Sequence, residues 1–131
     1  MKTVGFIREQ NPIKIAVPLA TLRTSDEFNL VERKKVCEYL DEGVIILAWM
    51  TYFFDPETKS SIAPDCYYSD GVWVWPSYYR YYIQKYPDLR IDPDFLDFLR
   101  LKNFKIEVDP AFRRDHISFE NQLAILLQEN S

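Results

Sequence analysis

The sequence predicts an α+β fold, with a small antiparallel sheet packed against flanking helices. The strand-like patterns lie mid-chain, where an apolar run of eleven residues from Val44 to Phe54 opens a meander that continues to Trp75. Helical patterns lie mostly before and after this region, so strands and helices do not alternate as they do in a parallel α/β sheet. A length of 131 residues with 47% hydrophobic and 27% charged side chains is typical of one globular domain, so we expect residues 1–131 to share one core.

Two short strands and one helix are expected in the first third of the chain. Residues 3–7 and 13–17 are apolar or alternating and are punctuated by Pro12 and Pro18, which predicts short or edge strands. Capping patterns over residues 24–27 and 29–32 each place a glutamate three residues after a polar residue, so a helix begins in this region and should end at Gly43. Its buried face contains Val36, Cys37 and Leu40.

The run from Val44 to Phe54 is continuous and rich in β-branched and aromatic residues, which predicts a central strand buried on both faces. Residues 62–68 are expected to return as its antiparallel partner, although Pro64 favours an edge position for that strand. A tight turn over residues 69–71 then leads to a third strand at residues 72–75.

Three further helices are expected after this sheet. Pro76 should start the first, because a first helical turn does not use the amide hydrogen that proline lacks. Its buried stripe comprises Tyr78, Tyr79, Tyr82, Ile83 and Tyr86, and Tyr81 alone falls among its polar residues Arg80, Gln84 and Lys85. Asp92 and Pro93 cap a second helix over 94–103 that buries Phe95, Phe98 and Leu99, and a third over 118–128 buries Phe119, Leu123, Leu126 and Leu127.

Residues 67–86 hold nine of the twenty-one aromatic side chains, which comprise nine Phe, nine Tyr and three Trp. Each buried ring hides roughly 150–250 Å², so we expect some of these rings to lie at the surface, Tyr81 and one of Trp73 and Trp75 among them. Trp73 and Trp75 share one strand face, and the pattern leaves open whether that face points inward. Aromatic residues with charge at the edge are typical of an interface centre. The predicted partner-binding residues are Asp70, Trp73, Trp75, Tyr78, Arg80 and Tyr81.

No pattern in the sequence indicates catalysis, a cofactor or a metal. The single histidine, His116, is adjacent to Asp115, but neighbouring side chains on a regular element point apart, so a surface or helix-capping role is favoured. The carboxylates of Asp92, Asp94 and Asp97 suit a helix N-terminus better than a cation site. Cys37 and Cys66 lack ligand spacing and are expected to be structural thiols. We therefore expect no catalytic, cofactor-binding or metal-binding residues.

The charge balance favours a basic protein partner. Sixteen basic and twenty acidic residues give a net charge of −4, which disfavours nucleic acid, because phosphate backbones are bound by neutralising their charge. The apolar stretch at residues 4–7 is shorter than a secretory signal requires, so a cytoplasmic protein is expected. The run at 44–54 is about half the ~20 residues that a membrane-spanning helix needs, so we expect no membrane association.

Residues 67–100 resemble small bacterial immunity-type proteins encoded beside secreted toxins. The resemblance lies in the Asp70-Gly71 turn, the Trp-x-Trp-Pro step from Trp73 to Pro76, the tyrosine-rich helix, and Pro93 followed by Phe95. It implies a non-catalytic inhibitor that binds and neutralises a toxin, and the net charge of −4 favours a basic toxin domain as the partner. Two alternatives stay open: a small enzyme or ligand-binding domain with its site in segment 67–86, and a self-associating structural subunit.

Overall fold

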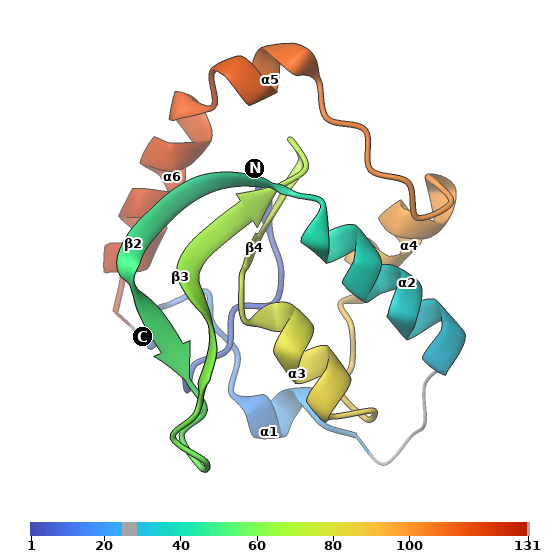
Figure 1. Cartoon of the computed structure of the whole chain (residues 1–131), viewed down its shortest axis with the longest axis vertical. Coiled ribbons are helices and arrows are strands. Elements are labelled where there is room, and N and C mark those ends of the chain that lie inside the picture. Colours follow the sequence, from blue (N-terminus) through green and yellow to red (C-terminus); the bar gives the residue numbers. More distant parts are fainter. Residues whose placement is uncertain (25–28, 131) are drawn as a thin grey trace.

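The computed structural model describes residues 1–24 and 29–130. Strands lie at the centre of the fold and helices surround them (Figure 1), which confirms the α+β class with a small sheet. Within the described residues the elements are β1 (Lys2–Thr3), α1 (Leu19–Leu22), α2 (Leu30–Asp41), β2 (Val44–Phe54), β3 (Ser61–Ser69), β4 (Trp73–Pro76), α3 (Tyr79–Lys85), α4 (Pro93–Leu101), α5 (Pro110–Arg114) and α6 (Ile117–Gln128).

The sheet is mixed, with strand order β1-β4-β3-β2. The meander β2-β3-β4 is antiparallel as expected, but β1 pairs with β4 in parallel, so the expectation of a purely antiparallel sheet is wrong. The strands expected at 3–7 and 13–17 are also shorter than predicted. The first shrinks to Lys2–Thr3, and the second forms only the isolated bridges Ile7 to Val17 and Ile13 to Asn130.

The expected central strand, β2, is an edge strand. Among the described strands it pairs with β3 alone, and β3 separates it from β4. Only Ile46 and Phe53 are buried along it, so the expected burial of both faces is also wrong. The reason is topological: β1 and not β2 lies beside β4, and helices α2, α3 and α4 gather on the side away from β2 (Figure 1). Pro64 accordingly lies in an interior strand, next to a register shift, where proline is tolerated.

The strand that is buried on both faces is β4. All four of its residues are buried, including Val74 and the two tryptophans. The Trp73 ring packs against Phe95 of α4 with 5.1 Å between ring centroids, and Trp75 packs against Phe95 and against Tyr39 of α2 at 6.1 Å. The indole N–H of Trp75 donates to the Leu40 carbonyl at 3.3 Å. The core is therefore centred on the aromatic segment.

Helices α2 and α4 follow their capping signals, but the expectation that Pro76 starts a helix is wrong, because Pro76 ends β4 and α3 begins at Tyr79. Asn29 caps α2 by accepting from the Glu32 amide at 3.1 Å; the other expected start, at residues 24–27, includes residues outside the described ones. Asp92 caps α4 by accepting from the amides of Asp94 and Phe95, with Pro93 at the first helical position. Buried residues match the predicted stripes at Val36, Cys37, Leu40, Tyr79, Tyr82, Ile83, Phe95, Leu99 and Leu123.

Candidate protein-interaction site

Three of the four aromatic residues predicted to bind a partner are inside the protein. Trp73, Trp75 and Tyr78 are buried, so the expectation that one of the two tryptophans is exposed is wrong. The Tyr78 hydroxyl accepts from the Ile7 amide at 2.9 Å and donates to Asn11 Oδ1 at 2.6 Å. Burial raises the pKa of Tyr78 well above its ordinary value. The polar atoms of Tyr78 and Trp75 thus find partners within the core, whereas Trp73 Nε1 is buried without a hydrogen-bond partner among the described residues.

Asp70 is likewise a buried structural residue. Its carboxylate accepts from the amides of Val72 and Trp73 at 2.9 and 2.7 Å, which closes the turn between β3 and β4. The Tyr39 hydroxyl donates to the same carboxylate at 2.5 Å, and burial together with this bond raises the pKa of Tyr39. A surface role for Asp70 is excluded by its burial.

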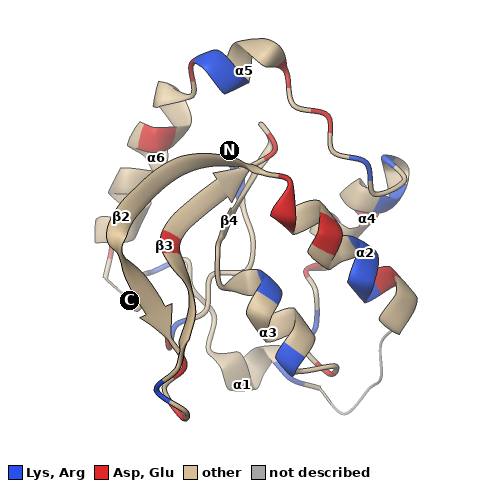
Figure 2. Ribbon diagram, viewed as in Figure 1, with Lys and Arg blue, Asp and Glu red and all other residues tan. Residues whose placement is uncertain are grey.

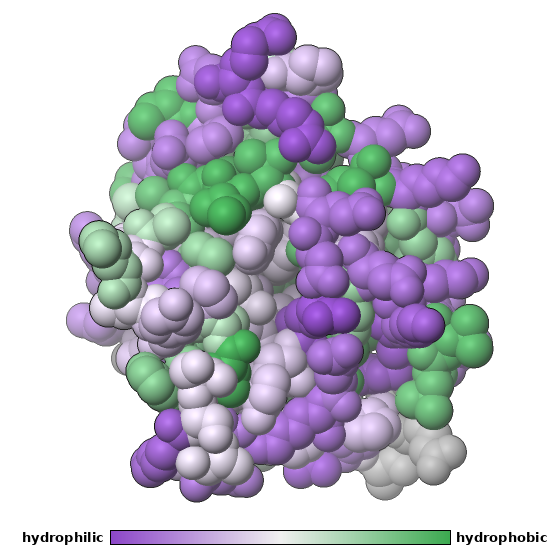
Figure 3. Space-filling view, in the orientation of Figure 1, coloured by the Kyte–Doolittle hydropathy of each residue, from purple (hydrophilic) through white to green (hydrophobic). Residues whose placement is uncertain are grey.

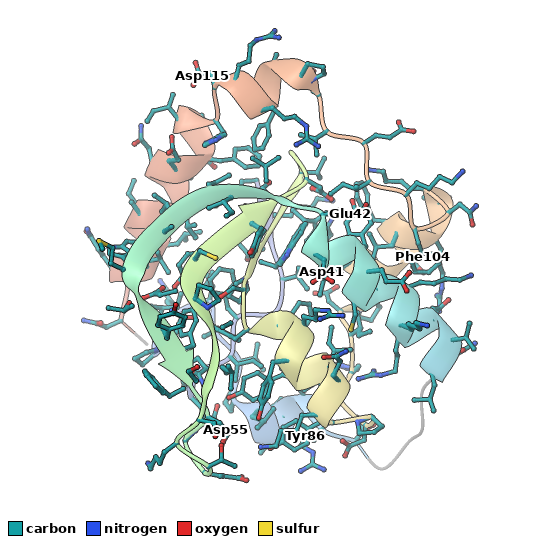
Figure 4. All side chains as sticks on the ribbon, viewed as in Figure 1. Asp41, Glu42, Asp55, Tyr86, Phe104 and Asp115 are labelled. Atoms are coloured by element: carbon teal, nitrogen blue, oxygen red, sulfur yellow. The ribbon has the colours of Figure 1, made fainter. Side chains whose placement is uncertain are left out.

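Tyr81 is half-buried, contrary to the expectation that it is exposed. Its hydroxyl donates to Asp55 Oδ2 at 2.6 Å, and Lys85 Nζ donates to the same oxygen at 2.6 Å. Asp55 is buried at the lower end of β2 and lines a small hollow together with Tyr86 (Figure 4). The bonds from Lys85 and Tyr81 hold the pKa of the Asp55 carboxyl well below its ordinary value. This network ties α3 to the turn after β2.

Arg80 is the predicted site residue with the most exposed side chain. Its guanidinium forms an ion pair with Asp41 at the C-terminal end of α2, with 3.2 Å between Nε and Oδ1 (Figure 4 labels Asp41). About 41% of the Arg80 side chain is exposed. A contact of Arg80 or Tyr81 with a partner stays a prediction.

Exposed apolar side chains gather instead on β2. Five of the eleven exposed large hydrophobic residues among the described ones belong to this strand. Met50 is fully exposed, and the other four have exposed fractions between 50% and 58%. We call this set the β2 edge surface: Ile45, Trp49, Met50, Tyr52 and Phe54. The remaining exposed hydrophobic residues are spread over α2, α4, α6 and the turn before β4, and scattered single residues of this kind are normal.

The β2 edge surface carries no charge. Figure 2 shows β2 without a charged residue, whereas α2 bears both signs. Figure 3 shows hydrophobic surface over the region of β2 and α6 and mostly hydrophilic surface over α2. Among the described residues, no strand pairs with the outer main-chain edge of β2. Long, exposed, apolar edges are unfavourable in a free protein and are suited to contact with another chain.

The other residues that the sequence analysis singled out for possible chemistry include His116, Cys37 and Cys66. His116 is the N-cap residue of α6 but its side chain makes no capping hydrogen bond, and its ring lies 5.7 Å from that of Phe112. Cys37 and Cys66 are buried free thiols, and burial raises the pKa of Cys37. In the described part of the chain, no three potential ligands cluster as a metal site would require, and no helix is long and apolar enough to cross a membrane.

Comparison with protein-family models, with curated proteins and with solved structures found no match to this chain.

Proposed function

We propose that this chain is a non-catalytic protein-interaction domain that binds its partner through the β2 edge surface. The observation that supports this proposal most strongly is that five large apolar side chains lie exposed on one uncharged edge strand. Trp, Tyr, Phe and Met are the residue types enriched at the centres of protein interfaces, where charged residues are depleted. Covering this surface would remove from water an apolar area that the free protein leaves exposed.

In its most specific form the proposal is an immunity-type inhibitor that neutralises a bacterial toxin in the cytoplasm. The resemblance of residues 67–100 supports this form, and the net charge of −4 would attract a basic toxin domain electrostatically. Most of the aromatic residues that carry the resemblance are buried, so in this proposal they stabilise the fold. The proposed contact surface is therefore on β2.

The test combines partner capture with toxin neutralisation. Wild-type protein and the Met50→Glu variant are used to capture partners from the native host, and the captured protein is then expressed in a sensitive strain. Growth arrest that wild type relieves and Met50→Glu does not relieve supports the proposal. Leu101→Glu is the matched control, because Leu101 is 89% exposed on α4. Equal rescue by all three proteins would show that β2 is not the contact surface.

Self-association is a second candidate, favoured by the unpaired outer edge of β2, since two such edges pair readily. Light scattering over a range of concentrations separates the two functions. A dimer that Met50→Glu dissociates supports self-association, whereas a monomer at every concentration rules it out.

A further inference from the structure

The β2 edge surface has an irregularity at its middle. Ala48 pairs with Cys66 and Tyr52 pairs with Pro64, so the three residues 49–51 stand opposite the single residue Asp65. Such bulges bend a strand and redirect its side chains. Here Met50 projects fully into solvent, and the Trp49 ring lies edge-on to Tyr67 with 5.9 Å between centroids.

An open hollow of about 310 Å³ lies beside this bulge. Its walls come from the bulge, from β3, from the N-terminal segment and from α6. They include Asn11, Trp49, Met50, Asp65, Tyr67 and Leu127. The walls are thus largely apolar and aromatic, with one carboxylate among them.

No cationic side chain among the described residues forms an ion pair with that carboxylate. Asp65 Oδ2 accepts from the Thr51 hydroxyl at 2.9 Å, whereas Oδ1 is enclosed and has no hydrogen-bond donor in the part of the chain that the structure describes. Burial raises the pKa of Tyr67 to about 12; the bond from Asn11 opposes this and the nearby Asp65 charge adds to it.

We propose that this hollow binds an arginine side chain of the partner protein, with the Trp49 ring as the stacking surface and Asp65 as the counter-charge. The proposal rests on the β2 edge surface being the contact surface. A guanidinium is planar and weakly hydrated and stacks on aromatic rings, and an acidic group nearby attracts it. Arginine is also among the residues that most often dominate binding energy at interfaces. A second copy of this chain is disfavoured as the occupant, because each copy carries a charge of −4.

The experiment uses a peptide pair that differs by one charge. The probe is a short acetylated and amidated peptide of alternating threonine and valine with one central arginine, and its twin has citrulline there. Titration follows the indole resonances of the protein by NMR, where Trp49 is half-exposed and the other two tryptophans are buried. We expect the Trp49 resonance to shift and the arginine peptide to bind about fivefold more tightly or better, as expected for one stacked and paired cation.

Variants of the protein test whether the preference for the arginine peptide arises in the hollow. Asp65→Asn keeps a hydrogen-bond acceptor for the Thr51 hydroxyl. It should bring the ratio of the arginine peptide's affinity to the citrulline peptide's affinity close to one. Glu107→Gln makes the same charge change at an exposed residue outside the hollow and should leave the ratio unchanged. If Asp65→Asn does not fold, Trp49→Leu, followed by calorimetry, should reduce the ratio by removing the stacking surface.

The outcomes also separate this inference from the proposed function. Equal binding of the two peptides at Trp49 overturns the arginine pocket while leaving β2 as a contact surface. The inference is likewise overturned by an arginine preference that persists in Asp65→Asn, by no binding of either peptide, or by a concentration-dependent Trp49 shift that shows a second copy in the hollow.

Discussion

Two apolar regions of this molecule, the aromatic segment 67–86 and strand β2, have opposite environments. Of the nine aromatic side chains of segment 67–86, six are buried and three are partly buried. On β2, by contrast, nine of eleven residues are at least partly exposed. The two regions differ in their place in the sheet: in the described part of the chain, β4 lies between β1 and β3, whereas β2 has β3 as its single neighbouring strand. Apolar composition thus indicates that burial of a strand is favourable. The strand order of the sheet decides whether other elements of the same chain bury it.

Polar partners explain how the protein encloses so many tyrosines. The hydroxyls of Tyr67, Tyr78 and Tyr82 all bond to side chains of the N-terminal segment, Asn11 or Gln10. The N-terminal segment therefore satisfies groups that would otherwise be costly to bury.

The largest expected difference lies between two tryptophans, one from each region. Trp75→Ala should lower the free energy of unfolding by about 3–5 kcal/mol, because it removes a fully buried ring from the core. Trp49→Ala should lower it by about 1 kcal/mol or less, because half of that side chain is already in water. Urea unfolding of both variants measures the difference. Similar losses in the two variants would mean that the two regions do not differ in burial.

A second comparison uses two neighbouring residues of β2. Ile46→Ala should cost about 2–5 kcal/mol, because Ile46 is buried. Ile45→Ala should cost about 0.5 kcal/mol, because Ile45 lies on the exposed side of the same strand. Equal denaturant midpoints for the two variants would contradict the edge position of β2.

The smallest expected effect concerns the anchor between β2 and α3. Asp55→Asn should lower the free energy of unfolding at neutral pH by about 1–3 kcal/mol, since it weakens charge-assisted bonds to Tyr81 and Lys85. Because the folded-state pKa of Asp55 lies below its ordinary value of 3.8, the stability it contributes is complete above that pH and is lost as the pH falls further.

The check is to repeat urea unfolding of wild type and Asp55→Asn at about pH 6 and about pH 2.5, where the gap between them should narrow. Glu107→Gln, which alters an exposed carboxylate, is the control. A gap of constant size would show that the Asp55 charge does not stabilise the fold.

Local signals predicted α2, α4 and α6 well, missed the short helices α1 and α5, and predicted the sheet order poorly. The caps at Asn29 and Asp92 and the stripe of α3 are predicted from neighbouring residues. The caps were confirmed, and the stripe was confirmed except at Tyr86, which is only partly buried. Strand order depends on long-range pairing, and the decisive pair is β1 with β4, which are separated by about seventy residues (Lys2 with Trp73). A strand of two residues gives almost no sequence pattern, so the pairing of β1 with β4 could not be predicted. The edge position of β2 could therefore not be predicted from the sequence either.

The expectation that Trp73 or Trp75 is exposed was wrong for the same reason. The number of rings in segment 67–86 suggested that the core could not bury all of them. The groups that bond to the tyrosine hydroxyls and so allow their burial lie far away in the sequence, at Ile7, Gln10 and Asn11. The signal for the β2 edge surface was weaker: Thr51 interrupts the apolar run, and in the structure it marks the bulge and bonds to Asp65.

The central claim, that β2 is the contact surface, is tested most directly by a matched pair of variants. Met50 and Leu101 are both nearly fully exposed, and they lie on β2 and α4 respectively. Both Met50→Glu and Leu101→Glu should leave the free energy of unfolding within about 0.5 kcal/mol of wild type. Calorimetric titration against the captured partner should show affinity at least tenfold weaker for Met50→Glu, because a charge would be buried at the interface centre, and unchanged affinity for Leu101→Glu. Unchanged affinity for Met50→Glu, or an equal loss in both variants, would contradict the claim.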